Sequence, residues 1–199
     1  MWALVESNNV TQVYTRPKAL TIGDVNYPSN IFMLWSASEL EAMGIYEVVI
    51  DNTNLKDKEY YINTNQSFAF GSGKVTATYG TATAKPMDNI LFTAQDETDG
   101  LGTEGEVKQT GIRQGHIDAI NAQAAGNLSP TDWMVVRAAE GGTAVPSSIT
   151  TQRAAVRTKA NAMCTQITNA ANVDALAALY VYNDDETPVR PLGELPTVG

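Results

Sequence analysis

The sequence contains almost none of the residues that build metal clusters and disulfides. It has 1 cysteine and 1 histidine among 199 residues. A single cysteine excludes a disulfide within the chain, and these two residues cannot form a zinc site of several Cys and His ligands. A chain of this length can bury an apolar core without cross-links. We therefore expect a core held by packing and no cofactor.

Basic residues are also scarce. The 13 Lys and Arg residues stand against 22 Asp and Glu residues, which gives a net charge of −9. Contacts to phosphate need clustered Lys and Arg, so nucleic acid is not an expected partner. No apolar run approaches the length of a membrane span, and residues 1–10 lack the basic and apolar segments of a signal peptide. We expect no membrane partner and synthesis in a cytoplasm.

The chain changes character near residue 90. Val, Tyr, Ile and Thr alternate with polar residues before this point, and Ala-rich helical periodicity follows it. Strands followed by helices indicate the α+β class. We expect an antiparallel β-rich domain with one short helix over residues 1–85 and an acidic linker over 86–104. A helical hairpin or bundle over 105–182 and an extended Pro-rich tail over 183–199 would follow.

The expected strands of the first domain are bounded by Gly, Asn and Pro turns. They cover residues 2–6, 10–15, 19–22, 25–27, 45–50, 59–62, 67–70 and 74–79. The clearest helix signal lies between the fourth and fifth of these. Ser36 and Glu39 form a capping box, and Trp35 can pack on Leu40 as a hydrophobic staple. Gly44 suits the left-handed position after the last turn.

Three helices are expected in the second half. The first runs from about 105 to 125, and the second begins at Ser129 and ends at Gly141. The third follows Pro146 and carries a heptad seam with one Arg in it. The seam residues are Ile149, Arg153, Val156, Ala160, Met163, Ile167 and Ala170. Asn172 can cap a last short helix.

The acidic linker allows a weak calcium reading. With Gly100 at the sixth position of an EF-hand loop, Glu97, Asp99 and Glu106 fall at positions three, five and twelve. The first position is Gln95, which lacks the carboxylate, and no helix is expected before the loop. We interpret the stretch as a solvated acidic linker, with a calcium site as the weaker alternative.

No catalytic constellation stands out, so an enzyme is not expected. His116 lies on the apolar face of its helix without an accompanying nucleophile motif, and Cys164 is adjacent to a seam residue. The Gly-Ser-Gly-Lys run at 71–74 lacks the spacing of a phosphate loop. Arg137, Arg153 and Arg157 could bind an anion, but we interpret them as structural. In that reading they pair with the acids of neighbouring helices and fix the helix register.

A segment of the second half resembles a recurring module of tailed bacteriophages. The matching residues are Thr131, Asp132, Trp133, Arg153 and Arg157. Their order resembles the C-terminal module of the tail-fibre assembly and tail assembly chaperone family. The family usually has Tyr where Gln152 stands and Leu where Val156 stands. The resemblance implies that Trp133 anchors the second helix against the third. It also implies that Arg153 and Arg157 pair with Asp132 or with backbone carbonyls.

This resemblance leads to an expected function. The chain would be a non-enzymatic virion structural protein of a phage tail or tail fibre. It would assemble with other tail or fibre proteins and with copies of itself. Charged residues make up 18% of the chain, below the usual level of about a quarter, so its surface offers little electrostatic barrier to such packing.

Two alternatives remain open. The first is a transient tail-fibre assembly chaperone, which would leave before the virion matures. The second is a carbohydrate- or receptor-binding module that uses strand tyrosines as stacking platforms. The candidates for such platforms are Tyr14, Tyr27, Tyr60, Tyr61 and Tyr79.

Overall fold

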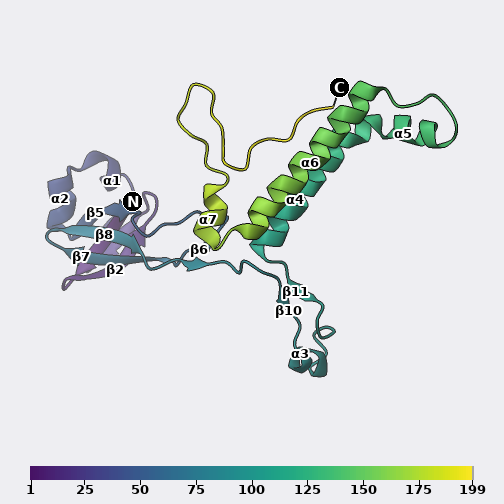
Figure 1. Ribbon diagram of the computed structural model, residues 1–199. Coiled ribbons are helices and arrows are strands. Elements are labelled where there is room, and N and C mark those ends of the chain that lie inside the picture. The colour runs from purple at the N-terminus through teal and green to yellow at the C-terminus, as the bar shows by residue number, and fades with distance from the viewer. Residues whose placement is uncertain (199) are drawn as a thin grey trace. The chain divides into compact units, whose positions relative to one another are not determined.

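The computed structural model describes residues 1–198 and divides into two compact units (Figure 1). The first unit spans Met1–Thr83 and holds most of the strands. The second unit begins at Ala84 and holds the long helices. The α+β class is therefore confirmed. Among the described residues, no helix is both long and apolar enough to cross a membrane.

A five-stranded sheet forms the first unit, in the order β2-β1-β5-β8-β7. Its strands are β1 (Trp2–Glu6), β2 (Asn9–Tyr14), β5 (Ile45–Asp51), β7 (Gln66–Gly71) and β8 (Lys74–Tyr79). The sheet is mixed rather than purely antiparallel as expected, because β5 and β8 pair in parallel. The hairpin of β7 and β8 places β7 at the edge and turns β8 back beside β5. The alternation of apolar and polar residues within a strand does not reveal which other strand pairs with it.

Each face of this sheet carries its own apolar cluster. Successive residues of a strand point to opposite faces, so Ala3 and Leu4 of β1 belong to different clusters. Ala3 packs with Val48 and Val75, contributed by strands. Leu4 packs instead with residues of two short helices and a small hairpin. These elements are α1 (Ile31–Leu34), α2 (Ala37–Ala42), β3 (Leu20–Ile22) and β4 (Val25–Tyr27).

The predicted capping box of α2 is confirmed. The Ser36 amide donates to Glu39 Oε2 at 2.7 Å, and the Glu39 amide donates to Ser36 Oγ at 3.3 Å. Leu40 is buried, and Trp35 packs against the same cluster. Gly44 has φ +78°, and a Cβ there would lie 2.8 Å from the carbonyl oxygen of Val5, so only glycine fits the turn that leads into β5.

The stretch expected to be a linker contains regular structure at the start of the second unit. It holds β10 (Ile90–Leu91) and α3 (Ala94–Thr98), and β11 (Val107–Gln109) pairs with β10. Thr93 and Asp96 form a second capping box, with the Thr93 amide 2.9 Å from the carboxylate. The stretch has no packing period because α3 has no buried residue, so only its capping box marks this helix in the sequence.

The helices of the second unit are α4 (Ile112–Leu128), α5 (Asp132–Ala139), α6 (Ser147–Asn169) and α7 (Val173–Ala178), with a 3₁₀ turn, η1 (Ser129–Thr131), before α5. Helices α4 and α6 lie side by side as an antiparallel hairpin (Figure 1). Arg113 at the start of α4 reaches the Ala170 carbonyl after α6, and Arg153 of α6 reaches Leu128 at the end of α4.

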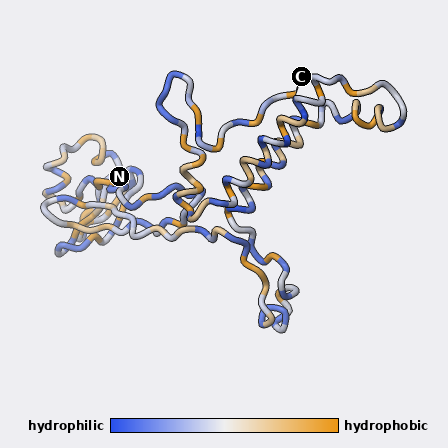
Figure 2. The backbone as a smooth tube through the Cα atoms, in the orientation of Figure 1, coloured by the Kyte–Doolittle hydropathy of each residue, from blue (hydrophilic) through white to orange (hydrophobic). Residues whose placement is uncertain are grey.

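The expected seam of α6 is buried over its C-terminal part. Val156, Ala160, Met163 and Ile167 are all at most 5% exposed. Hydrophobic and hydrophilic residues recur in turn along both hairpin helices (Figure 2). The seam faces Ile120 and Ala124 of α4, which are buried as well. Helix α4 begins at Ile112 rather than near 105, because β11 occupies the preceding residues.

The C-terminal segment is held against the helices instead of extending freely. Leu192 is fully buried, and its amide donates to the Leu179 carbonyl at 3.0 Å. Lys159 of α6 donates to the Leu192 carbonyl, also at 3.0 Å. Asn127 of α4 donates to the Pro196 carbonyl. A Pro-rich composition predicts extended backbone, but it does not show whether that backbone packs on a neighbouring element.

Candidate interaction surfaces

Arg153 joins α6 to the end of α4 and the start of α5. Its Nη1 donates to the Leu128 carbonyl at 2.8 Å and to Thr131 Oγ1 at 2.6 Å. Its Nη2 donates to Asp132 Oδ1 at 2.7 Å. The last carbonyls of a helix lack partners within the helix and carry partial negative charge. The forked guanidinium therefore closes the end of α4 and holds the turn to α5 with one side chain.

The other two predicted arginines are placed differently. Arg157 lies one turn further along α6, is exposed, and lines a pocket of about 280 Å³ beside Val135 and Val145. Within the described residues it makes no hydrogen bond or ion pair, so it does not join Asp132 as the resemblance implied. Arg137 stacks over the Trp133 ring, with 4.8 Å from its guanidinium carbon to the ring centroid.

The structure does not support the anchor role that the resemblance implied for Trp133. The residue is 54% exposed, and α5 has no buried residue at all. Val135 and Val136 of the same helix are 42% and 55% exposed. We call these three side chains the α5 surface. The helix is attached through η1 and Arg153, and none of its apolar side chains is fully buried.

A second cluster, which sequence reasoning missed, organises the C-terminal segment. The guanidinium carbon of Arg190 lies 5.4 Å from the Tyr180 ring centroid and 5.5 Å from that of Tyr182. Its Nε lies 2.8 Å from the Glu194 carboxylate, which also accepts a hydrogen bond from the Tyr182 hydroxyl. That hydrogen bond is the main reason why the pKa of Tyr182 is raised and the pKa of Glu194 is lowered. An open apolar pocket of about 590 Å³ adjoins the cluster.

An aromatic pocket of about 210 Å³ lies in the first unit. Trp2, Phe32 and Trp35 line it together with two acidic residues, Glu41 and Glu47. The Trp2 and Phe32 rings are tilted against each other with centroids 4.9 Å apart. Trp35 was predicted only as a helix staple. Its part in a pocket was not foreseen, because Trp2 lies far away in the sequence.

The tyrosines suggested as carbohydrate platforms do not form a common surface. Tyr14 and Tyr60 are only 4% and 5% exposed, so their rings are not available for stacking with a ligand. Tyr14 belongs to the core cluster beneath α1, and its hydroxyl donates to Gln12 Oε1. Tyr27 packs edge-on against Trp35 with centroids 5.8 Å apart. Strand aromatics here serve mainly in packing.

The calcium alternative is not supported by the geometry. Glu97 Oε2 accepts from the Glu104 amide, and Asp99 Oδ1 accepts from the Gln95 side chain. The Glu106 side chain takes no part in these hydrogen bonds. In residues 1–198, no group of three His, Cys, Asp or Glu side chains converges in a way that could hold a metal ion.

His116 and Cys164, the candidate base and nucleophile, both make packing contacts with neighbouring side chains. The His116 ring lies tilted against the Tyr180 ring with centroids 4.7 Å apart. Cys164 Sγ lies 3.7 Å from Asn121 Oδ1, and burial raises the pKa of this thiol, which favours its unreactive protonated form. Cys164 and Asn121 lie on the facing helices α6 and α4, and Tyr180 follows α7, so both contacts are those of packed side chains.

The pH response of the β10–α3–β11 hairpin can be predicted from Asp96. Hydrogen bonds from Lys108 and from Thr93 lower the pKa of Asp96 from 3.8 to about 2. A lowered folded-state pKa means that the stabilisation is present above pH 3.8 and is lost as the pH falls through about 2. We expect the carboxyl carbon of Asp96 to titrate by NMR with a midpoint near the lower value. Lys108→Met should raise this midpoint, and an unchanged midpoint would contradict the assigned pairing.

Comparisons with protein-family models, with curated proteins and with solved structures gave no match for this chain. The resemblance of the Thr131–Arg157 segment to a tail assembly module therefore stays a prediction based on those residues.

Proposed function

We propose that this chain is a non-enzymatic structural protein of a bacteriophage tail or tail fibre that mediates protein–protein assembly. The observation that carries the proposal is surface area. Two separate compact units of these lengths would together expose about 11,000 Å², whereas the chain exposes 12496 Å². The excess, about 1,500 Å², is larger than the roughly 800 Å² that each partner contributes to a standard protein–protein interface.

Large apolar side chains contribute to this exposed area in three stretches of the second unit. The first is the β10–α3–β11 hairpin, where Leu101 is 61% exposed. The second is the α5 surface, and the third surrounds Val181 and Val189, which are 64% and 58% exposed. Exposed apolar side chains that gather in short stretches, rather than being scattered singly, are typical of sites of association in soluble proteins. It suits neighbours in an assembly or further copies of the chain.

The resemblance of the Thr131–Arg157 segment supports the assignment to a phage tail. In this proposal the hydrogen bonds of Arg153 to Leu128 and Asp132 fix the position of α5. The apolar residues of α5 thereby remain available to a neighbouring protein. The virion would then be the place where these surfaces are covered. Homo-oligomers and contacts to other tail or fibre proteins both fit this arrangement.

Mass spectrometry of purified virions tests the proposal. We expect peptides of this chain in mature particles, at a copy number comparable with tail or fibre proteins of the same phage. A non-virion protein of the same phage serves as the control for contamination. Presence in infected cells but absence from mature particles would overturn the proposal and favour the transient chaperone. Co-expression with the fibre protein, scored for soluble trimer, would then test the chaperone directly.

A further inference from the structure

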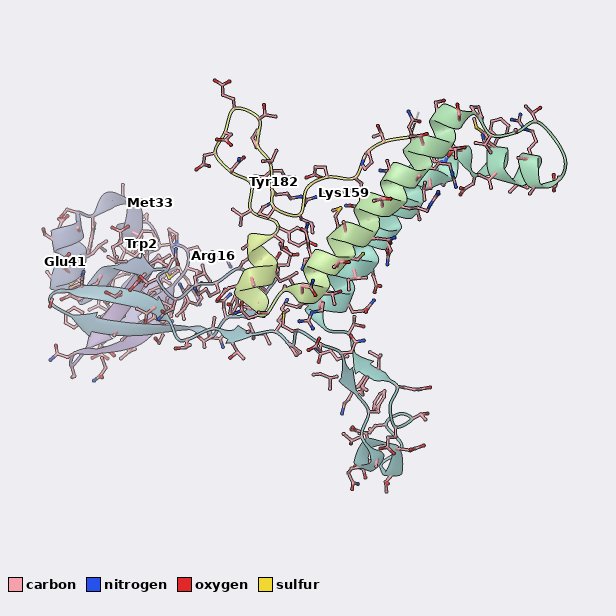
Figure 3. The ribbon with its side chains drawn as sticks, viewed as in Figure 1. Trp2, Arg16, Met33, Glu41, Lys159 and Tyr182 are labelled. Carbon is pink, nitrogen blue, oxygen red and sulfur yellow. The ribbon has the colours of Figure 1, made fainter. Side chains whose placement is uncertain are left out.

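The aromatic pocket of the first unit has the chemistry of a site for a cation. We propose that it binds one basic side chain, lysine or arginine, presented by a partner protein. The proposal rests on the assembly function in one respect: the basic side chain is supplied by a partner protein and not by a small molecule. Trp2 and Glu41, labelled in Figure 3, belong to two of the elements that form the pocket, β1 and α2.

The fold builds the walls of the pocket from separate elements. Pairing of β1 with β5 sets Trp2 directly opposite Glu47. Phe32 comes from α1, and the capping box of α2 fixes the backbone beside Trp35. Beneath them, Leu40 and Ile45 are 5% and 1% exposed, so the floor is apolar and packed. A pocket set by sheet pairing and a capped helix is already formed before a ligand arrives.

The rim supplies negative charge that the protein itself does not neutralise. Glu41 and Glu47 are both exposed, and in the described residues neither carboxylate has a hydrogen-bond or ion-pair partner. No basic side chain lines the pocket. A cation above the indole and phenyl faces would be attracted by the rings and by both carboxylates together.

Other ligand classes fit this lining less well. An anion would be repelled by the two carboxylates. A neutral sugar needs donors as well as acceptors around its hydroxyl groups, and apart from the indole N–H groups the lining side chains offer acceptors only. A lysine or arginine side chain matches both the apolar floor of the pocket and its acidic rim, Glu41 and Glu47. Its aliphatic stem can pack on the floor while its charged head lies near the carboxylates. The volume of about 210 Å³ suits one side chain and not a folded segment.

The test uses the full chain and the indole N–H signals of its 3 tryptophans in NMR spectra. The probes are the tripeptides acetyl-Gly-Lys-Gly-amide and acetyl-Gly-Arg-Gly-amide, with acetyl-Gly-Gln-Gly-amide as the neutral match and N-acetylglucosamine as the sugar arm. We expect the basic peptides to shift Trp2 and Trp35 saturably. Trp133, which lies in the second unit, should not shift and serves as an internal reference.

Variants of Glu41 and Glu47 test whether these two carboxylates bind the basic side chain. The double variant Glu41→Gln/Glu47→Gln should weaken binding of the Lys peptide by about fivefold, as expected for the loss of two exposed ion pairs. Glu6→Gln removes an exposed charge of the same unit that does not line the pocket, and it should leave the affinity unchanged. Equal binding of the Gln peptide or of the sugar would overturn the proposal. So would an equal loss in Glu6→Gln, or no saturable shift. Virion proteomics is a separate readout, so failure of one proposal is distinguishable from failure of the other.

Discussion

Leu192→Ala is expected to destabilise the attachment of the C-terminal segment by about 2–5 kcal/mol, the usual range for truncating a buried leucine. Leu192 is fully buried, although it follows a stretch of exposed residues. Its carbonyl also accepts a hydrogen bond from the Lys159 ammonium, and its amide donates to the Leu179 carbonyl. Loss of the side chain leaves a cavity beneath these polar contacts, which cannot hold the segment by themselves.

Hydrogen exchange measured by mass spectrometry reports this effect locally. In the Leu192→Ala variant, amides over residues 183–198 should exchange faster while those of α4 remain protected, since weakly held segments open independently of the core. Val189→Ala is the matched control, because Val189 is 58% exposed on the same segment. Equal acceleration in both variants would show that burial of Leu192 does not hold the segment.

Arg153→Ala is expected to lower the free energy of unfolding of the second unit by about 2–3 kcal/mol. Its side chain is 12% exposed and makes three hydrogen bonds, to Leu128, Thr131 and Asp132. The Asp132 side chain is 57% exposed and can return to water, which keeps the loss below that for a fully buried pair. The Leu128 carbonyl at the end of α4 keeps the hydrogen bond that it accepts from the Thr131 hydroxyl at 3.0 Å, but both groups lose their charged partner. Urea unfolding followed by circular dichroism measures the change.

Arg157→Ala provides the matched control on the same helix face. Arg157 lies four residues from Arg153, is exposed, and should change stability by about 0.5 kcal/mol at most. Arg153→Lys should be intermediate, since one ammonium cannot reproduce the forked geometry. Equal losses in the two alanine variants would contradict the role assigned to Arg153.

Local signals in the sequence predicted local structure well. The Ser36 and Glu39 capping box, the Asn172 cap of α7 and the buried part of the α6 seam are all present. Each depends on backbone groups or side chains a few residues apart, and their geometry is repeated whenever such a segment is helical. The turn at Ser7 and Asn8 is of the same kind, with φ of 49° and 64°.

The candidate sites were predicted only in part. Arg153 was recognised from its position in an apolar seam, where a charged side chain needs partners. The resemblance implied that Trp133 anchors the second helix against the third, yet none of the side chains of α5 is buried. The aromatic pocket was not predicted at all. It requires β1 to pair with β5, which brings Trp2 to Glu47 across more than forty intervening positions.

The sequence by itself determined the α+β class, the helix caps, the turn residues and the seam of the long hairpin, because these follow from short-range backbone bonding and from the period of apolar residues. Only the tertiary structure decided that β5 and β8 run in parallel, that Leu192 is buried, that the α5 surface is exposed and that an acidic aromatic pocket exists. Those features depend on which distant segments pack together. That choice is the sum of many weak contacts, none of which leaves a mark at a single position in the sequence.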